Sequence, residues 1–271
     1  MKTLLAHSMC MAVCTNLAFA QVADQSDDPD SFGTEVSFSV LAGQSYAGLT
    51  STVTGASGSG GATPFLSTAT ILAGRASTDT TVRFSWRTPN LNEYYGTSTV
   101  GPMNDSAGYS SLLSDVLHLQ GIASTGSQLP DGRRPVDPFV LQLTYQDGAF
   151  LDAVYEYGAT IDWTEDDIVA AGEIQIAHRP VGGVWTENSL GNISSAAALV
   201  TNFSGSWAQF ASTYGANDDN LTTFIGCWGV NKQTNHVWAV IDHNSVFAVV
   251  PAPGSAALLG MAGLFAGRRR R

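Results

Sequence analysis

The chain has 271 residues, with 23 acidic and 12 basic side chains and a formal net charge of −11. Only 13% of the residues are charged while 10% are aromatic, which excludes a disordered polyelectrolyte and allows a sizeable hydrophobic core. An acidic surface repels phosphate backbones, so we expect no nucleic-acid partner.

The N-terminal segment predicts export. A single lysine precedes a modest apolar stretch, and Ala18 and Ala20 supply the small residues that a signal peptidase requires. Residues 1–20 are therefore predicted to be a signal peptide that is cleaved before Gln21. Cleavage leaves Cys227 as the one remaining cysteine, so we expect no internal disulfide and a buried thiol.

The next segments differ in texture. Residues 21–34 are acidic and rich in turn-forming types, which predicts a flexible leader. The body is expected to span residues 35–250. Within it, residues 128–137 combine Pro, Gly and Asp, and they mark either a boundary between two β units or a long loop inside one.

Most of the body is predicted to be β-structure. Short runs of β-branched and aromatic residues are bounded by glycine or proline. Val82, Phe84 and Trp86 alternate with polar residues, as in a half-buried strand. Further strands are predicted in TEVSFSVLAG, ATILAG, FVLQLTY, EIQIAHR, TTFIGCWGV, HVWAVI and VFAVV. We therefore predict an all-β fold, an antiparallel β-sandwich of the jelly-roll kind or similar, with one short helix.

The helix is predicted in WTEDDIVAAG, where Thr164 is a suitable N-cap, acids fill the first turn and Gly172 follows the end. The last three strands are linked by NKQTN and DHNS, which predicts an antiparallel meander with short hairpins. Asp242 and His243 are then expected in a hairpin loop, since residues in one tight turn do not form a catalytic triad.

No catalytic function is predicted. The sequence contains no GxSxG, HExxH or GxGxxG motif, so neither an enzyme nor a cofactor is expected. A glycoside hydrolase stays open as a less favoured alternative, because Asp162, Glu165 and Glu187 could meet in space as paired carboxylates.

Two small groups are candidates for ligand binding. Tyr94 and Tyr95 stand in the polar stretch NLNEYYGTS and could stack on sugar rings. Asp218 and Asp219 belong to a cluster of oxygen ligands without EF-hand spacing, and they are weak candidates for calcium. No other metal site is indicated.

The C-terminal segment, residues 251–271, predicts contact with a membrane. As a helix, its charge-free residues 252–267 would measure about 24 Å, which is shorter than the ~30 Å hydrocarbon core. The arginines that follow would remain cytoplasmic. We expect either transient insertion during export or a permanent anchor. The residues that define the segment are Pro251, Ala252, Pro253, Arg268, Arg269, Arg270 and Arg271.

This order of proline-x-proline, apolar helix and arginine cluster resembles the PEP-CTERM sorting signal of exported bacterial proteins. The likeness covers residues 251–271, and Ala252 stands where the family has glutamate. The resemblance implies recognition by an exosortase, a membrane protease or transpeptidase, and delivery to the cell surface or extracellular matrix. The second half of the body, with DPFVLQLTY, AAGEIQIAHR, TENSLGN and GCWGVNKQTNHVWAVIDHNSVFAVVPAP, is also similar to the C-terminal β region of exported proteins of Planctomycetes and Verrucomicrobia, and no activity follows from that likeness.

Two functional hypotheses follow. The first is an exported structural or adhesive protein of the cell surface or matrix. The alternative is a carbohydrate-binding module that acts on exopolysaccharide.

Overall fold

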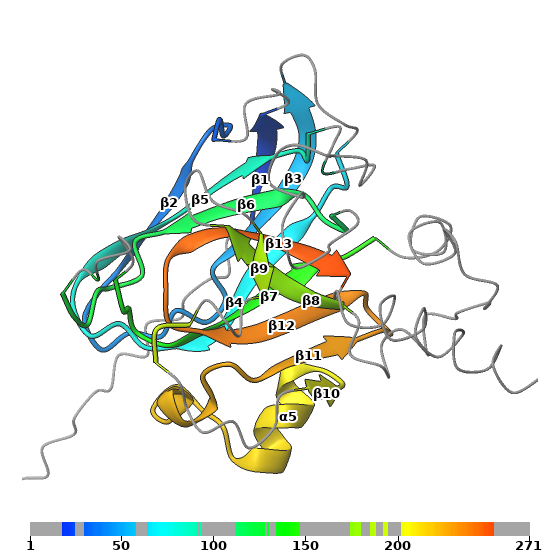
Figure 1. Ribbon diagram of the computed structural model, residues 1–271. Coiled ribbons are helices and arrows are strands. Elements are labelled where there is room, and N and C mark those ends of the chain that lie inside the picture. The colour runs from blue at the N-terminus through cyan, green and yellow to red at the C-terminus, as the bar shows by residue number, and fades with distance from the viewer. Residues whose placement is uncertain are drawn as a thin grey trace, which may run out of the picture.

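The computed structural model describes residues 18–24, 30–57, 64–90, 93, 112–127, 129, 134–146, 174–179, 185–187, 192–194 and 202–251. Strands dominate these residues (Figure 1). The elements are β1 (Ala18–Asp24), β2 (Val36–Val40), β3 (Thr50–Ser57), β4 (Thr68–Gly74), β5 (Thr80–Arg87), β6 (Val116–Gln120), β7 (Phe139–Thr144), β8 (Ile174–Arg179), β9 (Thr186–Glu187), β10 (Asn202–Ser204), α5 (Trp207–Tyr214), η1 (Leu221–Phe224), β11 (Trp228–Asn231), β12 (His236–Ile241) and β13 (Ser245–Pro251).

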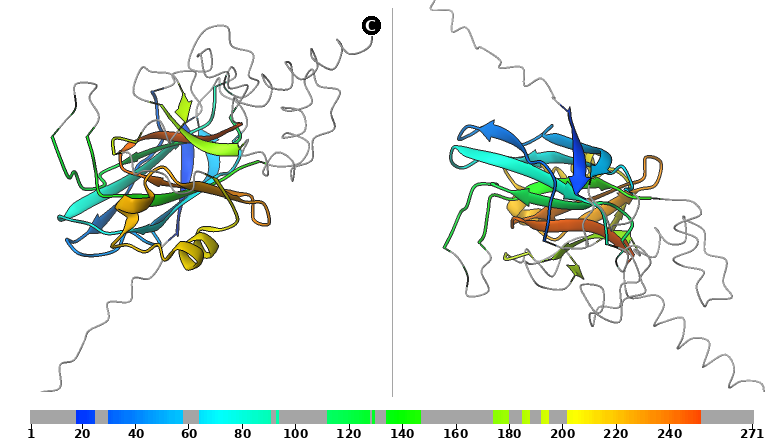
Figure 2. Two further views of the ribbon diagram at one scale, coloured as in Figure 1. Left: turned by 60° about the horizontal axis from the view of Figure 1, so that its bottom comes forward. Right: turned by 90° about the horizontal axis from the view of Figure 1, so that it is seen from above.

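All thirteen strands belong to one sheet. Its order is β10-β11-β12-β7-β4-β3-β1-β5-β6-β13-β8-β9, and β2 pairs with β5 outside this path. The sheet curls so that its two halves face each other, and the curl can be followed from above in Figure 2. Strands β6 and β7 lie on either side of residues 128–137 in sequence, and both belong to this sheet.

The hydrophobic core fills the space between the two halves. One half contributes inward residues of β4, β7 and β12, such as Ile71, Leu141 and Val237, and the other contributes residues such as Phe84 and Phe247. These side chains are fully buried. The alternation predicted for β5 is confirmed at Val82, Phe84 and Trp86, which point into this core.

The predicted antiparallel sandwich is confirmed only as a β-rich fold. The sheet is mixed, because β1 runs parallel to β3 and to β5 and β10 runs parallel to β11. Strands β1 and β3 are parallel because β2, which lies between them in sequence, runs in the opposite direction and brings the chain back to the starting side. Strand β1 thereby joins the two halves of the sheet, an arrangement that a jelly-roll of antiparallel strands lacks.

The predicted C-terminal meander is correct for its first hairpin and wrong for its second. Strands β11 and β12 pair antiparallel with Trp228 opposite Ala239, as expected from NKQTN. Strand β13, however, pairs with β6 and β8 rather than with β12. The DHNS segment therefore carries the chain from one half of the sheet to the other.

The TTFIGCWGV stretch does not form one strand. Its first part is the 3-10 helix η1, and β11 begins only at Trp228. Gly226 has φ of +89°, which a continuous strand does not accommodate. Cys227, directly before β11, is buried as expected.

A short helix, α5, covers one end of the sheet beside β10 and β11 (Figure 1). Ser206 caps it: its hydroxyl accepts from Gln209 N, and the Gln209 side chain accepts from Ser206 N, a reciprocal capping box. Gly215 ends the helix in the left-handed conformation. Trp207 and Phe210 pack on Trp238 of β12. The helix expected around Thr164 lies outside the described residues.

Asp115, the residue before β6, forms hydrogen bonds with the segment that precedes β4. Its Oδ1 accepts from Phe65 N and its Oδ2 from Ser67 N, each at 3.0 Å. Burial raises the pKa of Asp115 to about 6 in spite of these donors.

The helices within the described residues are too short or too polar to cross a bilayer. The predicted sorting segment beyond Pro251 lies outside those residues.

Candidate functional site

The bond predicted for signal-peptide cleavage lies inside strand β1. Ala18, Ala20 and Gln21 stand opposite Thr50, Thr52 and Val53 of β3 in parallel register. In place of the mobile leader expected at residues 21–34, Gln21–Asp24 continue this strand. A proline-free run of alternating small and apolar residues favours this extended conformation. The acidic residues farther on led to the prediction of a flexible leader instead of a strand.

The side chains on the two sides of this bond differ in burial. Phe19 is 39% exposed and contacts only the edge of the core, where its ring meets Phe38 at 5.5 Å. Gln21 is 3% exposed and Ala23 is fully buried. The residues that tie β1 to the core therefore lie on the mature side of the predicted cleavage site.

Gln21 is the polar anchor of β1. Its Nε2 donates to Thr34 O at 2.7 Å and to Phe84 O at 3.1 Å. Its Oε1 accepts from the Ser51 hydroxyl, which in turn accepts from Trp86 Nε1 at 2.8 Å. The side-chain amide of Gln21 thus bonds to both halves of the sheet and to the segment before β2. The sequence does not reveal this role, because the partners of Gln21 lie far along the chain.

At the other end, Pro251 is the last residue of β13 and stands opposite Ile174 of β8. The predicted sorting motif therefore begins where the final strand ends. Ala252, Pro253 and the four arginines lie outside the described residues.

The two aspartates considered for calcium have other partners. Asp218 Oδ1 accepts from Gly74 N at 2.8 Å, and Asp219 forms an ion pair with Arg75 at 3.0 Å. They hold the segment after α5 against the end of β4. Among the described residues, no group of three or more His, Cys, Asp or Glu side chains could hold a metal ion. Tyr94 and Tyr95 lie outside the described residues.

A buried charged cluster, missed in the sequence, lies on the outer side of the sheet half that contains β5 and β8. Arg87 of β5 donates from Nη1 to Glu93 Oε2 at 2.6 Å and from Nη2 to Oε1 at 3.0 Å. Glu93 also accepts from Asn90 N at 3.0 Å and from Trp185 Nε1 at 3.1 Å. Arg87 is 1% exposed and Glu93 is fully buried.

The same cluster binds the segment before β2. Arg179 Nη2 of β8 lies 2.7 Å from Asp30 Oδ1. The Phe32 ring lies 5.8 Å from the Arg87 guanidinium carbon and 4.9 Å from the His118 ring. Residues of the expected leader thus cover two buried arginines, which explains why this segment is ordered against the body.

The electrostatics of the cluster follow from burial and pairing. Burial raises the pKa of Glu93, but Arg87 and the donors of Asn90 and Trp185 outweigh it, so that the pKa is lowered overall. Burial and the neighbouring Arg87 lower the pKa of Arg179. Four donors surround the Glu93 carboxylate, so its role is to hold these elements together rather than to accept a proton from a substrate.

The DHNS segment is not a solvent-exposed turn. Asp242 and His243 are each 1% exposed. Asp242 accepts from Ile193 N at 2.8 Å and from Ser194 N at 2.6 Å, and the His243 ring packs on the His178 ring at 4.8 Å. The expectation of a hairpin loop is wrong because β13 pairs with β6 and β8 instead of β12, and the buried aspartate satisfies backbone donors at this crossing.

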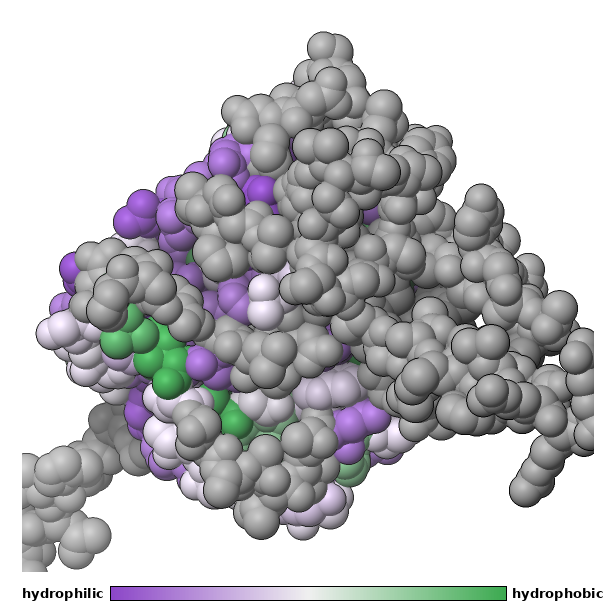
Figure 3. All heavy atoms as spheres, in the orientation of Figure 1, coloured by the Kyte–Doolittle hydropathy of each residue, from purple (hydrophilic) through white to green (hydrophobic). Residues whose placement is uncertain are grey.

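The upper left of the face shown in Figure 3, over β2 and β5, is largely hydrophilic.

In comparisons with known proteins, no family model matches the chain, and no curated protein or solved structure matches it.

Proposed function

We propose that the protein is exported and delivered to the cell surface or extracellular matrix, where its β-rich body has a structural or adhesive role. The observation that carries the proposal is the segment 251–271: a proline pair, a charge-free run and four arginines directly after the last strand. An exosortase-like membrane protease is the partner that this segment implies. The segment enters the membrane transiently when it is cleaved and permanently when it is not.

Two features of the body support this role. Strand β13 is paired with β6 over Ser245–Phe247 and with β8 as far as Pro251, so the body holds the first residue of the proposed sorting segment. Gln21 and Ala23 keep β1 attached to the core after the proposed removal of residues 1–20. Gln21, the proposed first residue of the mature chain, and Pro251 thus both belong to the folded body.

The test is to determine both termini of the native protein by mass spectrometry, using cell-surface and membrane fractions. We expect an N-terminus at Gln21 and a C-terminus close to Pro253, without the arginines. An intact Arg271 in the membrane fraction would overturn sorting by cleavage and leave a permanent anchor.

A matched pair of variants sharpens this test. Replacing Arg268, Arg269, Arg270 and Arg271 with alanine should leave unprocessed protein in the cell, because the positive charges that orient the segment are lost. Arg134→Ala, an exposed arginine of the body, should be processed normally. Equal processing of the two variants would contradict the proposed signal.

A further inference from the structure

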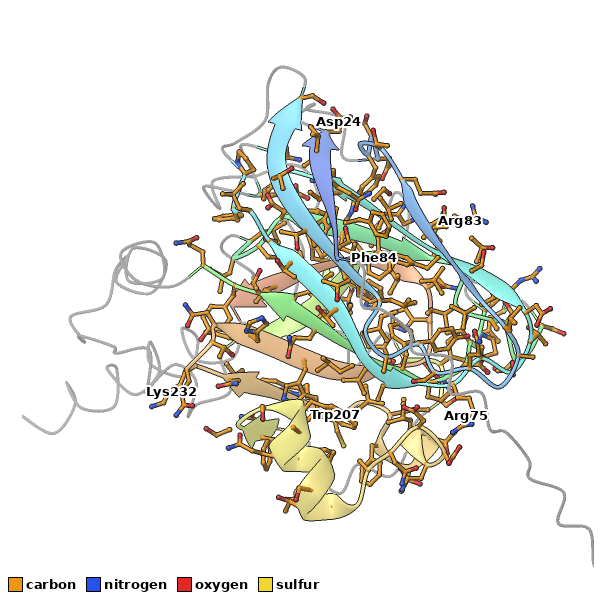
Figure 4. All side chains as sticks on the ribbon, turned by 180° about the vertical axis from the view of Figure 1, so that it is seen from behind. Asp24, Arg75, Arg83, Phe84, Trp207 and Lys232 are labelled. Atoms are coloured by element: carbon orange, nitrogen blue, oxygen red, sulfur yellow. The ribbon has the colours of Figure 1, made fainter. Side chains whose placement is uncertain are left out.

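Part of the outer face of strands β3, β4 and β7 consists of uncharged polar side chains. Because the inward residues of these strands are Val53, Ala69, Ile71, Leu141 and Leu143, the alternate residues point outward. Figure 4 looks onto this side of the sheet. We name it the threonine face, and its residues are Thr50, Thr52, Thr54, Thr68, Thr70, Gln142 and Thr144.

The face is neutral in a chain of net charge −11. None of these positions carries a charge, although the solvated side of an antiparallel sheet usually includes lysine, arginine or glutamate. His236 of β12 stands opposite Thr144, and burial lowers its pKa, so it remains neutral at neutral pH. Among the described residues, the neutral surface therefore extends to His236 at the start of β12.

The hydroxyl groups are held in fixed positions. The hydroxyl oxygens of Thr50 and Thr70 lie 3.1 Å apart, and those of Thr52 and Thr68 lie 3.0 Å apart. Thr144 Oγ1 accepts from Thr68 N at 2.8 Å. Because threonine is stiff at χ1, these bonds produce a regular array, with a spacing of about 4.8 Å between strands and roughly 6.8 Å along them.

The array ends where other elements cover the sheet. On the same outer side, Leu72, Val140 and Trp238 are apolar, and α5 and η1 pack over them. The side chains change from apolar to threonine beyond the residues on which α5 and η1 pack. Among the described residues of this face, Thr54 is exposed and the others are half-buried. Val22 of β1, 42% exposed, adds an apolar edge beside it.

We propose that the threonine face binds a neutral polysaccharide. Protein partners select apolar and aromatic centres, which this face lacks, and anionic polymers are repelled by the acidic body. A neutral glycan can exchange its bound water for the fixed hydroxyl and amide groups, and the apolar edge fits the C–H side of its rings. Each contact is weak, but a polymer repeats it along the array, which raises the overall affinity.

This inference is independent of the sorting segment, because it concerns the body alone. Its test is co-sedimentation of the full chain with insoluble neutral glucan and, as a charged comparison, with calcium-alginate beads. We expect binding to the glucan that high salt does not weaken, and little binding to alginate. Failure to bind the neutral glucan, or equal binding to alginate, would overturn the proposal.

A variant pair locates the site. Thr50→Val/Thr70→Val keeps the shape and β-propensity of the strands while removing one hydroxyl pair, and it should weaken glucan binding about tenfold. Thr81→Val, at an exposed position of β5 away from this face, should bind as the unmodified chain does. Thermal unfolding of both variants reports that the fold is intact. Unchanged binding by the folded double variant would contradict this location of the site.

Discussion

Arg87 and Glu93 form a bidentate ion pair in which neither side chain is more than 1% exposed. The pair lies beneath Phe32 and joins the end of β5 to Trp185. Breaking a buried pair from one side leaves an uncompensated charge, so Glu93→Gln should lower the free energy of unfolding by about 3–5 kcal/mol. Urea unfolding monitored by tryptophan fluorescence measures the loss.

A double variant separates charge from packing. Arg87→Met/Glu93→Leu removes both charges and keeps apolar volume, and it should be less destabilised than Glu93→Gln.

The pH dependence of stability gives a second measure of the Arg87–Glu93 pair. Because the folded-state pKa of Glu93 is lowered, its stabilisation is present above the pKa of the unfolded chain and is lost as the pH falls through the folded value. Glu93→Gln should lack this acid-induced loss.

Asp115 should act in the opposite direction. Its folded-state pKa of about 6 is above the usual value of 3.8, so the folded protein binds more protons than the unfolded chain between these values. Stability should therefore rise as the pH falls from 7 towards 4, and it should decrease as the pH rises through 6. Unfolding midpoints measured across this range in the unmodified chain and in Asp115→Asn test it. The rise should be absent from the variant, and a rise of the same size there would rule out Asp115 as its source.

Gln21 should be more important than its position in a predicted leader suggests. Gln21→Ala removes the two donors to Thr34 and Phe84 and the acceptor for Ser51, and it should cost about 2–4 kcal/mol. Val22→Ala at the next, exposed position should change stability by less than about 0.5 kcal/mol. Denaturant unfolding of chains beginning at Gln21 is the measurement, and equal effects of the two changes would contradict the anchoring role.

Two glycines with nearly the same positive φ test the close approach of β5 to the end of β6. Gly121 and Gly43 have φ of +80° and +81°. A Cβ on Gly121 would lie 1.9 Å from Thr81 O, while one on Gly43 would meet nothing within 4 Å. Gly43→Ala should therefore cost about 1 kcal/mol for the backbone conformation alone, and Gly121→Ala should cost several kcal/mol more. Thermal unfolding distinguishes the two, and similar losses would mean that the strand ends move apart easily.

Local sequence patterns predicted most strands but not their partners. Alternation identifies β5, whereas β7 and β12 were predicted from mostly apolar runs and are buried over most of both faces. Pairing depends on distant segments, and nothing local distinguishes a DHNS hairpin from a DHNS crossing. The helix α5 could have been found, since Ser206 and Gln209 form a capping box and Gly215 follows its end.

The candidate sites show the same division. A cleavage segment and a sorting segment are both predicted from short stretches of sequence, and their existence and processing stay predictions. The Arg87–Glu93 pair and the threonine face depend on strand register, which sets residues from distant parts of the chain side by side. Register is a property of the assembled sheet, so neither could be derived from any one stretch.

The place of β13 within the sheet has a mechanical consequence. A force applied to the chain beyond Pro251 enters the body through a strand that is bonded to β6 on one side and to β8 on the other. A pull along the strand direction loads those hydrogen bonds together, in shear, instead of opening them one at a time. An edge strand in the same position would carry the same pull on the hydrogen bonds to a single neighbour. The order of strands thus provides a strong point of attachment at the end of the body where a surface protein would be held.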